Sequence, residues 1–330
     1  DFPTAAAHPD ASNGPRHPNG LRYSTTDARR ITSAPGGCLF AVGKIDGSVE
    51  VWAPKGLPLP DRPDDFVTPE WPYRARSTES PPKQFHRLWR TLPHSGAVES
   101  LSFTMDCRSL LTVSGRTLKE FVEGPQHKGV PSYYMPVYEQ DAHSAKVVRT
   151  LAATGETEWE CPTDFVPAAF AVDHHSLVAP PGGPGEPRFA VVSRNHNLQI
   201  RSLTDGRELQ SFSIEPEVKP SSVHSVSFGN TDGYIWAVSS RYTGERSGVS
   251  VIQLSSWDLH RRQLIAVAEI PGQLMAAEWD RFGFNLATLR YLPELAQLNS
   301  DRRDSLFPWD TPPPSPFQFH VWKVKNLYAQ

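Results

Sequence analysis

Five basic residues occupy the same place in five repeated segments of the chain. Each directly follows a short apolar strand, in segments that read AVGK, VSGR, VVSR, VSSR and ATLR. The residues are Lys44, Arg116, Arg194, Arg241 and Arg290. Ammonium and guanidinium groups that converge on one surface bind carboxylates, phosphorylated segments or a nucleic-acid backbone. We therefore take these five as the candidate binding residues, and the alternative is a solvated loop charge or a pair with an acidic neighbour such as Asp46.

The common signatures of catalytic and metal sites are absent. The chain contains no HExxH, GxSxG, GxxxxGK[ST] or CxxC motif. Asp173-His174-His175 has ligand chemistry for a divalent ion, but no complementary ligand spacing accompanies it, which favours a polar turn. Three glycines at 182, 183 and 185 stand among prolines with no following helix, which favours an insertion over a phosphate-binding loop. We expect no catalytic residue, no metal and no cofactor.

The tryptophans divide into two groups. Those in predicted strands are expected in the core, where large aromatics fill space between sheets. They are Trp52, Trp236, Trp257, Trp279 and Trp322. Three others, Trp71, Trp159 and Trp309, lie in polar or Pro-rich connections. Of these, Trp71 and Trp309 are candidate partner anchors, with packing against their own sheet as the alternative.

The elements that must position these residues have the two-residue period of strands. Residues 31–53 predict a three-strand meander, with an Asp46-Gly47 turn between two apolar runs. An Asp-Gly pair there is typical of a type I′ hairpin turn, because both residues tolerate a positive φ. Residues 86–92 predict the fourth strand of this repeat.

The same order returns four more times, so the chain is built from repeats. The second repeat has predicted strands at 97–103, 109–114, 135–139 and 146–151, and the third at 166–172, 188–193, 198–203 and 208–214. The fourth has strands at 223–228, 234–239, 248–254 and 263–270, and the fifth at 274–279, 285–289 and 318–324. Four-stranded meanders bury both faces when they pack against one another as propeller blades.

These repeats resemble WD-repeat β-propellers over residues 21–327. Strands that end in Val51-Trp52-Ala53, Trp257-Asp258 and Val321-Trp322-Lys323 match the position of the family's Trp-Asp pair, and residues 92–96 look like its Gly-His element. The resemblance implies an all-β propeller of four-stranded blades, five recognised here as part of a ring that commonly has seven. It also implies that the five basic residues form a rim on the narrower face.

Composition sets limits on the surroundings of the domain. The net charge of −3, from 33 basic and 36 acidic residues, does not produce the field of a general nucleic-acid binder. The 32 prolines cluster in insertions at 57–82, 180–187 and 293–316, and residues 1–20 predict a flexible N-terminal segment. Three widely spaced cysteines favour a reducing compartment, and no apolar run is long enough to span a bilayer.

We therefore expect an intracellular, nuclear or cytoplasmic, non-catalytic scaffold subunit of a multiprotein complex, whose basic rim binds an acidic or phosphorylated partner. One alternative is a nucleic-acid-associated propeller that adds Arg261, Arg262, Arg302 and Arg303 to the rim. Another is a metal-dependent propeller hydrolase, against which the basic rim argues. A weaker one is a ubiquitin-ligase receptor, since residues 257–260 resemble a Trp-Asp-x-Arg element with His260 in the Arg position.

Overall fold

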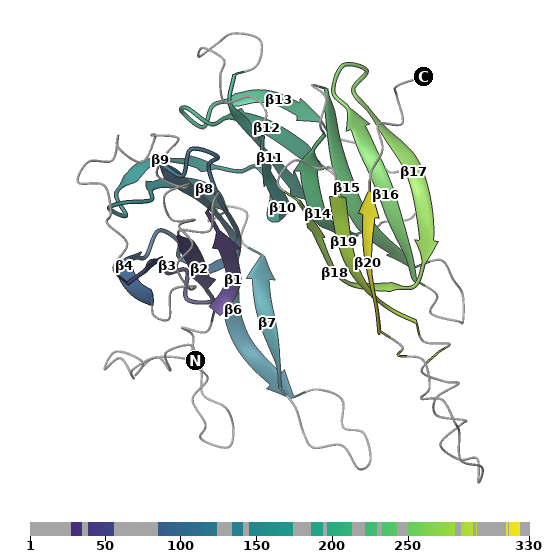
Figure 1. Ribbon diagram of the computed structural model, residues 1–330, viewed down its shortest axis with the longest axis horizontal. Helices are drawn as coiled ribbons and strands as arrows, with labels where there is room; N and C mark the ends of the chain where they lie inside the picture. The colour runs from purple at the N-terminus through teal and green to yellow at the C-terminus, as the bar shows by residue number, and fades with distance from the viewer. Residues whose placement is uncertain are drawn as a thin grey trace, which may run out of the picture. The chain divides into compact units, whose positions relative to one another are not determined.

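The computed structural model is built from β-strands, 20 of them in the part of the chain that it describes (Figure 1). No helix in that part is long and apolar enough to cross a membrane. The predicted segment 1–20, the insertion 57–82 and nearly all of the insertions 180–187 and 293–316 lie outside it. The described residues are 28–34, 39–55, 85–123, 134–140, 145–173, 186–193, 197–212, 222–229, 233–242, 250–280, 285–292, 295, 315 and 317–323.

The chain divides into two compact units, Asp1–Pro167 and Ala168–Gln330. The first sheet of the first unit is an antiparallel meander in the order β1-β2-β3-β4. Its strands are β1 (Ala28–Ser33), β2 (Phe40–Lys44), β3 (Val49–Pro54) and β4 (Phe85–Thr91). In β3, alternate residues Val49, Val51 and Ala53 are at most 1% exposed and pack with Val98 and Leu101 of the next sheet. This sheet confirms the first predicted repeat.

The second sheet corrects the prediction for the second repeat. It contains β5 (Ala97–Phe103), β6 (Ser109–Glu123), β8 (Lys146–Leu151) and β9 (Thr157–Pro162), with β7 (Tyr134–Gln140) paired to β6. The first half of β6 pairs with β8 and its second half pairs with β7, so β6 and β7 extend away from the sheet as a hairpin (Figure 1). The predicted third strand is therefore β7, which is an insertion, and the predicted fourth strand is β8, the third strand of the sheet. The actual fourth strand, β9, was not predicted.

The second unit contains three antiparallel sheets, which follow the third, fourth and fifth predicted repeats. The first has the order β10 (Pro167–Val172), β11 (Arg188–Ser193), β12 (Leu198–Ser202) and β13 (Glu208–Phe212). The next has β14 (Ser222–Phe228), β15 (Tyr234–Tyr242), β16 (Ser250–Asp258) and β17 (Gln263–Pro271). The last has three strands in the described part, β18 (Gln273–Trp279), β19 (Asn285–Tyr291) and β20 (Phe317–Lys323).

Successive sheets within each unit share hydrophobic cores. Alternation along β15 shows how one strand serves two of them: Ile235 and Ala237 pack in the core with the preceding sheet, and Trp236 and Val238 pack in the core with the following one. Side chains that alternate in this way bury both faces of a sheet. The predicted fold class, an all-β β-propeller of meander blades, is confirmed for these five sheets.

The hairpin between β2 and β3 differs from the predicted turn. Gly47 has a φ of +84°, whereas Asp46 does not have a positive φ. A type I′ turn needs a positive φ at both residues, so this turn is not type I′. The amide of Gly47 donates to the carbonyl of Lys44 at 3.2 Å, and the amide of Lys44 donates to the carbonyl of Ser48 at 2.9 Å. The hairpin is therefore a longer loop with one left-handed residue.

Gly47 is required at this turn for two reasons. Its φ is unfavourable for other residues, and a Cβ there would overlap the carbonyl oxygen of His94 and lie 2.7 Å from that of Gly96. We predict that Gly47→Ala lowers the free energy of unfolding by about 2–4 kcal/mol, measured by urea denaturation. Gly229→Ala should cost less, because its nearest neighbour is a side-chain atom 3.2 Å away. Equal losses in the two variants would contradict this account.

Candidate functional site

The structure describes the side chains of two of the five residues predicted to form the basic rim, Lys44 and Arg290. Lys44 ends β2, whereas Arg116, Arg241 and Arg290 lie within β6, β15 and β19, because these three strands run further than predicted. The side chains of Arg116 and Arg241 lie outside the described part of the structure, as do Arg194 and the candidate anchors Trp71 and Trp309. A rim formed by all five basic residues therefore stays a prediction.

Lys44 is held inside its own sheet. Its side chain is 10% exposed, and Nζ lies 2.8 Å from Oε1 of Glu50, whose side chain is 5% exposed. The two residues come from neighbouring strands, β2 and β3, on the face opposite the core residues of β3. The ammonium charge is thus compensated within the fold, by a different carboxylate from Asp46.

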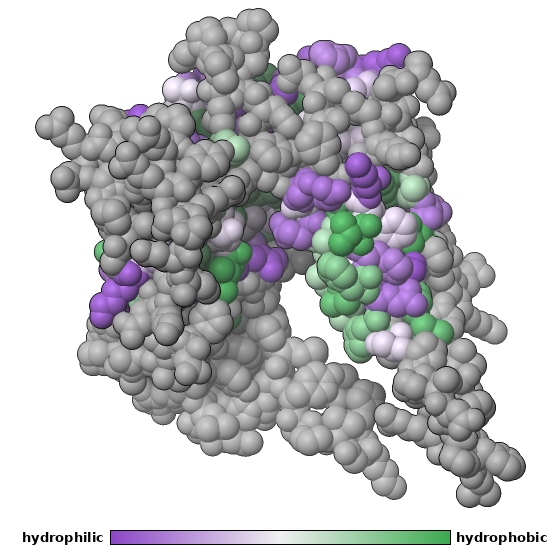
Figure 2. Space-filling model, viewed as in Figure 1, coloured by the Kyte–Doolittle hydropathy of each residue, from purple (hydrophilic) through white to green (hydrophobic). Residues whose placement is uncertain are grey.

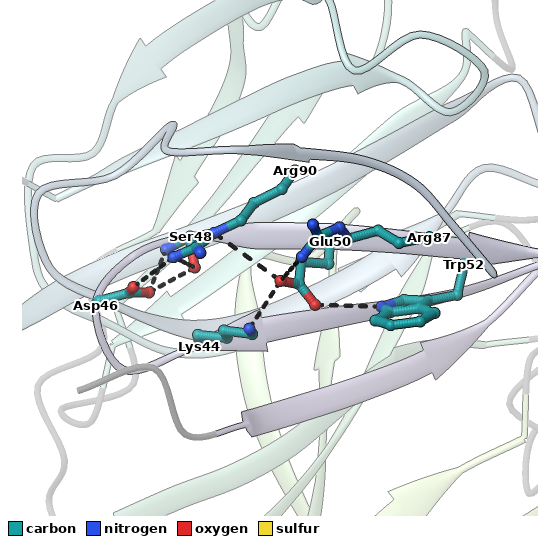
Figure 3. Close-up of polar contacts among 7 residues, drawn as sticks. All are labelled: Lys44, Asp46, Ser48, Glu50, Trp52, Arg87 and Arg90. Atoms are coloured by element: carbon teal, nitrogen blue, oxygen red, sulfur yellow. Dashed lines mark hydrogen bonds and ion pairs between the residues drawn. The ribbon is translucent and has the colours of Figure 1, made fainter. Parts of the chain in front are cut away.

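Glu50 is the centre of a polar cluster on this face (Figure 3). The guanidinium of Arg87 on β4 donates from Nη1 to Oε1 at 3.0 Å, and the indole Nε1 of Trp52 donates to Oε2 at 3.3 Å. Burial alone would raise the pKa of Glu50, but the hydrogen bonds and charges of Lys44 and Arg87 outweigh burial and hold that pKa below its ordinary value. The carboxyl group therefore stays ionised.

Asp46 extends the cluster to the turn (Figure 3). Its Oδ1 accepts hydrogen bonds from the amide of Ser48 at 2.9 Å and from the hydroxyl of Ser48 at 2.6 Å. Arg90 on β4 donates from Nη2 to Oδ2 of Asp46 at 3.0 Å, and its Nε lies 3.9 Å from Glu50 Oε1. Arg90 thus connects the two carboxylates, and the cluster ties the three strands together.

Sequence reasoning did not single out Glu50, Arg87 or Arg90. One local signal was present, because Glu50 lies between two valines in an apolar strand that ends in Trp52. Its partner Arg87 is 37 residues away along the chain, so the contact depends on how β3 and β4 pair. Ion pairs of this kind are set by strand register and cannot be found from spacing alone.

Removing the negative charge at Glu50 should leave its cations uncompensated. We predict that Glu50→Gln lowers the free energy of unfolding by about 2–3 kcal/mol, because a buried ion pair broken on one side is strongly destabilising and partial exposure of Arg87 moderates the loss. The measurement is urea denaturation. The control is Glu160→Gln, which removes a 2.6 Å pair with Lys146 whose carboxylate is 59% exposed. That change should cost less than about 1 kcal/mol. A loss for Glu160→Gln that exceeds the loss for Glu50→Gln would refute the assignment of Glu50 as the centre of the cluster.

Arg290 lies in a second polar row, between β19 and β20. Its Nη2 donates to Oε1 of Gln318 at 2.9 Å and lies 3.2 Å from Nε2 of His320. The ring of His320 stacks on Trp322 with centroids 5.4 Å apart, and Nε1 of Trp322 donates to Oγ1 of Thr288 at 2.9 Å. This row occupies the face of the last sheet on which Trp322 packs against the core shared with the preceding sheet.

His94, from the segment that resembles a Gly-His element, is buried at 2% exposure. Its Nε2 lies 2.8 Å from Oγ1 of Thr112 on β6. Burial, with a further contribution from the charge of Lys146, lowers the pKa of His94 to about 3. The imidazole is therefore neutral in the folded chain at neutral pH.

The lowered pKa makes stability depend on pH. The unfolded chain binds a proton at this histidine below about pH 6.5, whereas the folded chain does not bind it until about pH 3, so stability is full above pH 6.5 and is lost as pH falls. Between pH 8 and pH 5.5 the loss due to His94 is about 1.4 kcal/mol. We predict that His94→Gln, which keeps a hydrogen-bonding group near Thr112, removes this part of the pH dependence in urea denaturation. Parallel pH profiles for the variant and the wild type would count against this assignment.

The other predicted residues have mixed outcomes. Trp236, Trp257 and Trp279 are buried as expected, at 1–7% exposure, and Trp52 and Trp322 are half-buried. Trp159 lies in β9, so its predicted place in a connection is wrong. Asp173 is buried and accepts a hydrogen bond from Nε of Arg188 at 2.8 Å, while His174 and His175 lie outside the described residues. Among the residues that the structure describes, no group of three His, Cys, Asp or Glu side chains could hold a metal ion.

Exposed apolar side chains gather on the last sheet. Phe317, Phe319 and Val321 of β20 are 51%, 67% and 63% exposed, and Met275 of β18 is 51% exposed. Hydrophobic side chains are visible over β18–β20 in the space-filling view (Figure 2). The sequence predicted β20 as a strand but did not identify this surface, because alternation alone does not show which face is covered.

Comparisons with known proteins add little to this geometry. No protein-family model matches the chain, and no curated protein matches it. Among 890 matching chains of solved structures is the crystal structure of Saccharomyces cerevisiae Sqt1, at 12% identity and a TM-score of 0.46. The match covers 82% of this chain and 58% of that one, so the chain spans little more than half the length of its match. At this TM-score the likeness carries no argument about function.

Proposed function

We propose that the chain is a non-catalytic protein-interaction subunit of an intracellular complex, built on WD-repeat-like propeller blades. The observation that carries the proposal is the exposed apolar surface of the last sheet, formed by Phe317, Phe319, Val321 and Met275. Exposed apolar patches on soluble proteins mark interaction sites, because leaving such side chains in water is unfavourable. The strand endings at Trp52, Trp257-Asp258 and Trp322 support the WD-repeat-like assignment.

The described contacts also bear on the kind of partner. Two of the five proposed rim residues, Lys44 and Arg290, already have partners within their own sheets, Glu50 and Gln318. The charge of Lys44 and the hydrogen-bonding groups of Arg290 are thus partly used inside the fold, which favours recognition by apolar contact over recognition by the basic rim. An acidic or phosphorylated partner remains the rim's proposed ligand.

Affinity purification from the native cells tests this function. The tagged protein is captured in 0.1 M and in 0.5 M salt, and co-purifying proteins are quantified by mass spectrometry. We predict a stoichiometric partner set that survives high salt, because apolar contacts are not screened as exposed charges are. Recovery of the protein alone at both salt concentrations, together with turnover of a substrate or retention of a metal, would refute the proposal. Loss of every partner at high salt would point instead to binding through the basic rim.

A further inference from the structure

The last sheet has one face covered and one face exposed. Alternate residues of β20, Gln318, His320 and Trp322, are half-buried, and Trp322 packs against the core shared with the preceding sheet. The residues between them, Phe317, Phe319, Val321 and Lys323, are exposed. The exposed face is therefore an apolar row that ends in one cation.

The apolar row continues across the sheet to β19. Phe317, Phe319 and Val321 lie opposite Tyr291, Leu289 and Ala287 in the antiparallel register. Residues directly opposite one another share a face, and the rings of Phe317 and Tyr291 lie 5.3 Å apart. The exposed side chains of β20 and the half-buried ones of β19 thus form one surface over two strands.

The same strand has an unpaired edge in the described part of the chain. β20 pairs with β19 alone, whereas the third strand of every other sheet, β3, β8, β12 and β16, also pairs with a fourth. Each of those fourth strands is antiparallel to the third. An edge strand presents backbone N–H and C=O groups that pair readily with another strand, and β20 contains no proline that would prevent it.

We propose that β20 is a docking edge that accepts an extended segment of a partner protein as the fourth strand of this sheet. This inference rests on the proposed interaction function and deepens it. The backbone edge requires a β-strand, and the apolar row requires apolar side chains at every second position of that strand. Lys323 at the end of the row favours a carboxylate opposite it.

An antiparallel partner strand would therefore follow a defined pattern. Its acidic residue lies opposite Lys323 and is followed by apolar residues at the second, fourth and sixth positions after it, opposite Val321, Phe319 and Phe317. A second copy of β20 fits this pattern poorly. In the antiparallel register that overlaps the two strands fully, His320 faces His320 and Lys323 faces Phe317, so Lys323 has no anionic partner in either copy.

The test selects ten-residue peptides from a displayed random library against the full chain. We expect enriched peptides to share the pattern of one acidic and three alternating apolar residues. The most enriched peptide should slow amide hydrogen exchange in residues 317–323. Its affinity, measured by fluorescence anisotropy, should fall about tenfold or more in Phe319→Ser.

Ile31→Ser is the matched control, because Ile31 is a strand residue of 62% exposure in another sheet and should leave the affinity unchanged. Thermal unfolding checks that both variants remain folded. Enriched peptides without the pattern, protection elsewhere in the chain, or equal binding by the two variants would overturn the proposal. So would a dimer in light scattering that Phe319→Ser converts to monomer. If native partners still co-purify with Phe319→Ser, the interaction function stands and the docking edge does not.

Discussion

Burial of both faces of a sheet is the constraint on which this structure depends. A sheet that carries apolar residues on both faces must meet another sheet on each face to remove them from water. The sheet of β14–β17 satisfies this condition fully, since successive residues of β15 serve two different cores. Buried alanines, such as Ala41 and Ala53 in the first sheet and Ala190 in the third, are part of the cores that the other sheets share. The last sheet meets the condition on one face only, and its exposed aromatic residues follow from that.

The polar cluster around Glu50 shows how this fold includes charge. A buried carboxylate is unfavourable unless cations and donors surround it, and Lys44, Arg87 and Trp52 surround that of Glu50 at hydrogen-bonding distance. These partners come from β2, β4 and β3, so the cluster forms only when all three strands are in register. Its contribution is therefore to specify the alignment of the strands as much as to stabilise them.

How well the sequence predicted each feature depends on how far apart along the chain the residues lie that form it. Strands beside strong turn signals, such as those around Gly47 and Gly206, are local features and were located to within one or two residues. β9 was missed because it is exposed at most positions and lacks clear apolar alternation. The contact of Arg87 with Glu50, the contact of Arg290 with Gln318, and the uncovered face of β20 depend on pairing between distant segments, which one sequence does not reveal.

The position of Gly47 links the turn of one sheet to the segment that leads into the next. A Cβ at this position would meet the carbonyls of His94 and Gly96, which follow Gly47 by more than 40 residues along the chain. During synthesis the β2–β3 hairpin is made before that segment, and an isolated two-stranded hairpin has little stability in water. Its turn therefore acquires its final environment only after β4 and the start of β5 have been made. Because this contact closes a long loop, the first sheet and the entry to the second should become ordered together.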